Sequence, residues 1–244
     1  MKAVPLMFHV TVGLILTACT YKPIQSSQSY TNRLDVADSM ASDRCRYLAL
    51  GDSYTIGESV QSSERWPVQL VNLLRKEQIE IDEPLIIAKT GWTTDELIDS
   101  VEQQNPDGTY DLVSLLIGVN NQYRGRSTEE YREEFRTLLE RSIAFAGGKA
   151  SHVIVLSIPD WGVTPFAEGR DREQIGIEID EFNAINLEEA ERRGVHYVNV
   201  TPISREVSDN PTLLAADGLH PSGKMYEAWA RLVLPKVLPV LRSK

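Results

Sequence analysis

The sequence predicts an α/β domain of three layers, in which helices cover both faces of a five-stranded parallel sheet. From about Arg44 onward, apolar runs of strand length alternate with longer amphipathic segments, as expected for a parallel sheet covered on both faces. The chain of 244 residues is long enough for one well-buried domain and short for two. We therefore expect a single α/β domain after the N-terminal region.

Five apolar runs have the length and composition of buried strands. They cover residues 45–50, 84–88, 111–117, 152–157 and 195–200. Each run ends in a segment containing Gly, Pro, Asn or Asp, where the chain is expected to turn. If the strands are parallel, the segments that follow them meet at one edge of the sheet.

Amphipathic segments between these runs predict helices. A helix from about Glu64 presents an apolar side made of Leu70, Val71, Leu73 and Leu74. Another starts at Ser127, where Ser-Thr-Glu-Glu has the spacing of a capping box, and its apolar side comprises Tyr131, Phe135, Leu138 and Leu139. A third turns Phe182 and Ile185 inward, and the last buries Tyr226, Trp229, Ala230 and Val233. Pro235 is expected to end or kink that last helix.

The first 18 residues have the features of an export signal. Lys2 precedes an apolar stretch over residues 3–16, which is short for a membrane span. The ending Leu16-Thr17-Ala18-Cys19 resembles a bacterial lipoprotein signal, in which the cysteine is lipidated and becomes the first mature residue. A plain secretory signal with an incidental cysteine is the alternative. Thr20 after Cys19 favours the outer membrane over retention at the inner membrane.

These features predict a signal peptide (1–18), a flexible tether (19–43) and a folded α/β domain (44–244). The tether is rich in Ser, Gln, Asn and Asp and has no apolar periodicity. Cys45 is the only cysteine of the domain, so no disulfide can form within it. A formal net charge of −10 argues against nucleic acid as a partner.

Residues suited to nucleophilic catalysis follow several of the predicted strands. Ser53 follows the first strand and Gly91 the second, Asn120 follows the third, and His220 follows the fifth through a longer loop. Asp217 lies three residues before His220 in a loop containing Gly218, so its carboxylate can orient the imidazole. Capping or turn formation explains any one of these residues, but not their common position at one edge. Asp52 is expected to shape the turn beneath Ser53.

Four motifs in this order resemble the SGNH hydrolases, also called the GDSL esterase family. They are Gly51-Asp52-Ser53, Gly91 within residues 89–94, Gly118-Val119-Asn120-Asn121 and Asp217-Gly218-Leu219-His220-Pro221. The resemblance covers about residues 45–234 and implies a sheet of flavodoxin-like strand order. Tyr54 stands where the family name has Leu, and Asn121 stands where Asp is common.

The resemblance implies a catalytic triad of Ser53, His220 and Asp217. It further implies an oxyanion hole formed by the Ser53 and Gly91 backbone N–H groups and the Asn120 side-chain amide. The implied reaction is hydrolysis of carboxylic esters through an acyl-serine intermediate, without a metal or organic cofactor. The expected substrates are short acyl esters of saccharides or lipids in the bacterial envelope. Residues after the strands are candidates for the substrate pocket: Tyr54, Trp92, Gln122, Tyr123, Asp160 and Trp161.

Other functions remain open at this point. An acyltransferase would use the same groups with an alcohol acceptor, a peptidase fits the resemblance less well, and a lipoprotein that only binds would keep a dormant site. A shared metal site is disfavoured because His152 and His196 start strands, at the sheet edge opposite His220. Residues 51–57 lack the GxGxxG spacing of a dinucleotide cradle.

Overall fold

One parallel sheet with strand order β2-β1-β3-β4-β5 forms the centre of the domain. This computed structural model describes Met1 and residues 44–243, so the predicted signal peptide, tether and lipidated Cys19 lie outside the described residues. The strands are β1 (Tyr47–Gly51), β2 (Leu85–Ala88), β3 (Leu112–Leu116), β4 (Val153–Leu156) and β5 (His196–Val198). Every pairing is parallel, so the predicted flavodoxin-like order is confirmed.

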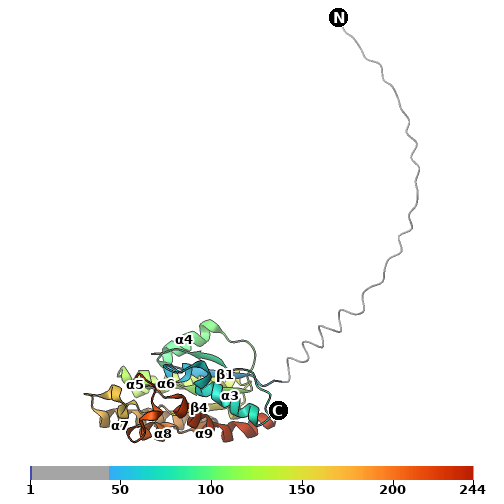
Figure 1. Cartoon of the computed structure of the whole chain (residues 1–244). Helices are drawn as coiled ribbons and strands as arrows, with labels where there is room; N and C mark the ends of the chain where they lie inside the picture. Colours follow the sequence, from blue (N-terminus) through green and yellow to red (C-terminus); the bar gives the residue numbers. More distant parts are fainter. Residues whose placement is uncertain (2–43, 244) are drawn as a thin grey trace. The chain divides into compact units, whose positions relative to one another are not determined.

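Helices cover the sheet on both faces (Figure 1). They are α2 (Ser53–Ile56), α3 (Trp66–Lys76), α4 (Thr94–Gln104), α5 (Val119–Tyr123), α6 (Thr128–Phe145), α7 (Arg172–Arg193), α8 (Thr201–Arg205) and α9 (Gly223–Arg242). Helix α3 packs against α9, while α6 packs against both α4 and α7. Within the described ranges, no helix is both long and apolar enough to cross a membrane.

Burial explains why these segments adopt their structures. All residues of the central strands β1, β3 and β4 are buried, whereas the edge strands β2 and β5 are partly exposed. The apolar sides predicted for the helices are buried in the same core. Ser127 caps α6 as predicted, because its side chain accepts a hydrogen bond from the Glu130 backbone N–H at 3.2 Å.

The last helix does not end at Pro235. Helix α9 includes both Pro235 and Pro239 and continues to Arg242. A proline inside a helix removes one backbone donor, but Val237 and Leu241, which follow it, are buried in the core. Burial of this apolar face beyond the proline stabilises the helical conformation despite the lost hydrogen bond.

Candidate active site

Ser53 is the first residue of the short helix α2, directly after the carboxyl end of β1. Asp52 caps this helix, because its Oδ1 accepts the backbone N–H of Tyr54 at 3.0 Å. The sharp turn also requires glycine at position 51, where a Cβ would lie 2.2 Å from Thr55 Oγ1 and 2.4 Å from Leu116 O. Asp52 therefore has the turn-shaping position that the sequence predicted, and the turn presents Ser53 at the edge of the sheet.

Burial of Asp52 makes the stability of the domain depend on pH. Its side chain is fully buried, which raises its pKa from 3.8 to about 7, although the backbone hydrogen bond from Tyr54 N opposes the shift. Protonated Asp52 therefore contributes favourably to the free energy of unfolding. This contribution is complete below pH 3.8, the pKa in the unfolded chain, and is lost as pH rises through about 7, the pKa in the folded protein.

Asp52→Asn is therefore expected to gain stability relative to wild type as pH rises. Asparagine keeps an oxygen acceptor for Tyr54 N but cannot ionise, so the free-energy difference between the two proteins should grow by about 2–4 kcal/mol from pH 4 to pH 8. Urea denaturation of both proteins across that range measures the difference. A difference independent of pH would contradict a raised pKa at Asp52.

The loop before α9 holds His220 and Asp217 together. His220 Nδ1 lies 2.6 Å from Asp217 Oδ2, and Asp217 Oδ1 accepts the backbone N–H groups of Leu219 at 3.0 Å and His220 at 2.9 Å. Ser59 donates a further hydrogen bond to Oδ2 at 2.6 Å. Partial burial alone would raise the pKa of Asp217, but these hydrogen bonds outweigh it and lower the pKa well below its ordinary value. Asp217 is thus a carboxylate that fixes the Nδ1–H tautomer of His220.

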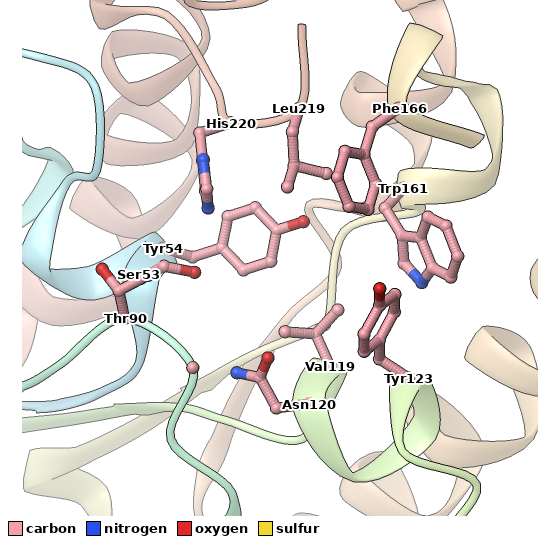
Figure 2. Close-up of a pocket in the computed structure, with 11 residues that line it drawn as sticks. Ser53, Tyr54, Thr90, Val119, Asn120, Tyr123, Trp161, Phe166, Leu219 and His220 are labelled. Atoms are coloured by element: carbon pink, nitrogen blue, oxygen red, sulfur yellow. The ribbon is translucent and has the colours of Figure 1, made fainter. Parts of the chain in front are cut away.

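Ser53 and His220 face the same cavity (Figure 2). Within the described part of the chain, the Ser53 hydroxyl is not hydrogen-bonded to the His220 ring. Such a bond often tightens only in the substrate complex. The Tyr54 ring packs edge-on against the His220 ring, with centroids 5.7 Å apart. Tyr54 thus packs against the imidazole and helps to hold it in place.

The other predicted oxyanion residues, Gly91 and Asn120, also line the cavity. Figure 2 shows Asn120, at the start of α5, across the cavity from His220. Gly91 has a φ of 89°, a left-handed conformation that favours glycine. Asn120 Nδ2 donates to the Trp92 carbonyl at 2.9 Å. This bond holds the amide in place and uses one of its two N–H groups.

Two further side chains, one from α5 and one from the residue after it, bond to the start of α4 and to the loop after β2. Asn121 is fully buried; its Oδ1 accepts the Thr94 N–H at 3.1 Å, and its Nδ2 donates to Thr94 Oγ1 at 2.6 Å. Arg124 donates to the Gly91 carbonyl at 2.7 Å. These bonds fix the position of Gly91 relative to Asn120. Asn in place of the family's usual Asp supplies the donor to Thr94, whose own hydroxyl donates to Glu134.

The cavity has a volume of about 180 Å³ and mostly apolar walls. Of the six predicted pocket residues, Tyr54, Tyr123 and Trp161 line it. Four further wall residues were not among the predicted pocket residues: Thr90, Val119, Phe166 and Leu219. Leu219 was detectable in principle, because it lies between the two predicted triad members in the loop. Figure 2 shows Tyr123, Trp161 and Phe166 gathered at the end of the cavity away from Ser53.

The remaining three predicted pocket residues do not line the cavity. Gln122 Oε1 accepts the Trp161 Nε1–H at 2.8 Å, so it holds a wall residue instead of lining the cavity. Asp160 is buried and pairs with Arg205 at 2.9 Å. Trp92 packs against the hydrophobic core. These three residues are not among those that line the cavity, and each packs against or pairs with another part of the protein.

The histidines at the opposite edge have separate environments. His152 lies just before β4, with its Nδ1 2.8 Å from the Asp111 carbonyl, and His196 is the first residue of β5. Across the described residues, no group of three or more His, Cys, Asp or Glu side chains is placed to hold a metal ion.

Most of the chain matches a known protein family. Residues 49–228 match the model of the GDSL-like lipase/acylhydrolase family. The chain belongs to this family. It is a serine esterase, a carboxylic ester hydrolase. No curated protein matches the chain.

Several solved structures share its fold. The structure titled TesA has a TM-score of 0.61 at 17% identity, covering 80% of this chain and 99% of its own. An acetylxylan esterase from Geobacillus stearothermophilus gives 0.63 at 21%, covering 79% and 94%. A lipolytic G-D-S-L protein from Veillonella parvula gives 0.60 at 18%, covering 78% and 96%. Structures of the acetylxylan esterase include catalytic mutants with a serine or a histidine replaced by alanine.

Proposed function

We propose that this esterase removes short acyl groups from saccharide or lipid esters in the bacterial envelope. The observation that carries the acyl preference is the small apolar cavity beside Ser53 and His220. A dry cavity of about 150 Å³ holds benzene, so a cavity of about 180 Å³ suits an acyl group of up to about six carbons. Tyr123 and Phe166 are both 44% exposed, so an acyl chain long enough to pass them would enter solvent.

The reaction begins with attack of Ser53 Oγ on the ester carbonyl, while His220 Nε2 takes the hydroxyl proton. The tetrahedral oxyanion accepts hydrogen bonds from the Ser53 and Gly91 N–H groups and from the Asn120 amide. His220 returns the proton to the leaving alcohol, and an acyl-Ser53 ester remains. Water activated by His220 then hydrolyses this ester. Asp217 stabilises the imidazolium in both steps, since its carboxylate accepts the Nδ1–H.

Acetyl on a saccharide is the substrate that we favour within this class. One neighbour of the same fold is an acetylxylan esterase. Aromatic rings at the outer end of the cavity, Tyr123 and Phe166, are exposed flat surfaces on which the face of a sugar ring can pack.

Activity against p-nitrophenyl esters of increasing acyl length tests the acyl preference. We expect kcat/KM to be highest between two and about six carbons and to fall at least about tenfold by dodecanoyl, because the cavity is filled. Release of acetate from acetylated xylo-oligosaccharides should exceed fatty-acid release from lysophospholipids. Rates that keep rising to dodecanoyl would contradict a short-acyl enzyme, and ester formation with added sugars would indicate an acyltransferase.

The envelope location rests on the sequence around Cys19. We propose that acyl chains on Cys19 anchor the protein, because two or more chains hold a protein stably on a bilayer. The full-length chain expressed in a bacterium should partition into the detergent phase, whereas Cys19→Ala should remain in the aqueous phase. Detergent partitioning unchanged by this substitution would refute lipidation at Cys19.

A further inference from the structure

Ser59 has an unusual backbone conformation and an unusual partner. It lies in the turn that follows α2, with a φ of 64°, a left-handed conformation that only glycine adopts without cost. Its hydroxyl donates to Oδ2 of Asp217, 158 positions along the chain, at 2.6 Å. The residue is exposed and does not line the cavity.

The backbone conformation makes the side chain informative. An ordinary residue in the left-handed region costs about 1–2 kcal/mol that glycine would avoid. Within the described residues, the only hydrogen bond of the Ser59 side chain is the one to Asp217. The serine at this position thus bears a conformational cost while its hydroxyl reaches one acceptor, the carboxylate beside His220.

That acceptor atom is the one on which the histidine depends. Asp217 Oδ2 accepts both His220 Nδ1 and the Ser59 hydroxyl, while Oδ1 accepts two backbone N–H groups. A carboxylate has about four acceptor positions, so all of them are used. The Asp217 side chain is 30% exposed, and water would otherwise compete for Oδ2. The Ser59 hydroxyl takes the place of this water as a donor that is fixed to the turn after α2.

We propose that Ser59 is a positioning residue of the triad, which holds the Asp217 carboxylate so that Oδ2 faces His220 Nδ1. This inference rests on the proposed catalytic roles of Ser53, His220 and Asp217. Ser59 lies six residues after Ser53, with α2 between them. The contact therefore ties the loop of Asp217 and His220 directly to the segment that carries the nucleophile.

Two substitutions separate this role from a purely structural one. Ser59→Gly and Ser59→Ala both remove the hydroxyl, but glycine relieves the backbone cost and alanine retains it. The melting temperature of the glycine variant should exceed that of the alanine variant. Both variants should lose about three- to tenfold in kcat for p-nitrophenyl acetate, with KM unchanged, because the hydroxyl does not touch substrate.

Gln78→Gly is the matched control. Gln78 has the same φ of 64° and is exposed in the turn after α3, on a segment that does not line the cavity. It should show the stability gain of a glycine without any change in kcat. Equal kcat values for wild type and Ser59→Gly would overturn the proposal, because the glycine variant lacks the hydroxyl but tolerates the left-handed backbone conformation.

Labelling with a fluorophosphonate distinguishes failure of this inference from failure of the proposed mechanism. Labelling of wild type at Ser53, with a rate lowered about three- to tenfold in both Ser59 variants, supports the positioning role. Labelling of wild type with equal rates in the variants refutes that role alone. Absence of labelling in folded wild-type protein refutes the nucleophile itself, and with it the basis of the inference.

Discussion

Ser53→Ala is expected to abolish ester hydrolysis while the protein remains folded. Loss of the nucleophile removes the acyl-enzyme route, so kcat should fall by at least about 10⁴-fold. Stability should change little, because the Ser53 side chain faces the cavity and alanine keeps its Cβ. Hydrolysis of p-nitrophenyl acetate and a thermal melt measure the two effects.

Ser151→Ala is a suitable control for this substitution. Ser151 is exposed and lies just before β4, at the sheet edge opposite the cavity, so its replacement should leave kcat unchanged. Mass spectrometry should locate the fluorophosphonate adduct of wild type on Ser53. Substantial hydrolysis by Ser53→Ala would rule out a covalent intermediate on this residue. Equal turnover by wild type and Ser53→Ala would show that the hydrolysis does not depend on this site. The alternative of a lipoprotein whose site only binds would then be open again.

Asn120→Ala should have the next largest effect. The substitution removes one donor to the oxyanion, and such a loss costs about 10²- to 10³-fold in kcat, with little change in KM. It also breaks the hydrogen bond to the Trp92 carbonyl, which should lower the free energy of unfolding by about 1 kcal/mol. Steady-state kinetics and urea denaturation separate the catalytic effect from the structural one.

Asn72→Ala provides the comparison for an asparagine outside the site. Asn72 is exposed on α3, so neither kcat nor KM should change. If Asn120→Ala raised KM and left kcat intact, Asn120 would bind the substrate in its ground state. Its assignment to the oxyanion hole would then be wrong.

Much of the fold could be predicted because its signals are local. The predicted strand 45–50 became β1, with its boundaries shifted by one or two residues, because each apolar run carries its own tendency to be buried. The capped start of α6 at Ser127 was equally local. Pro235 shows the limit: its own chemistry favours a helix end, but packing of Val237 and Leu241 against the core carries α9 onward.

The catalytic set could be proposed from the sequence because parallel strands place their carboxyl ends at one edge. Asp217 and His220 are three residues apart, so their hydrogen bond is nearly local. The pocket wall was harder. Gln122 and Asp160 follow strands as Tyr123 and Trp161 do, yet they are engaged by Trp161 and Arg205.

By itself, the sequence determined the strands and their parallel arrangement, because apolar period and turn residues act over a few neighbouring positions. It also predicted Ser53, His220 and Asp217 as a triad through the family resemblance. Tertiary structure alone decided which loop residues line the cavity, that Asn121 joins α5 to the start of α4 through Thr94, and that Ser59 reaches Asp217. The physical reason is distance along the chain: these contacts join segments whose meeting depends on how the whole sheet and its helices pack.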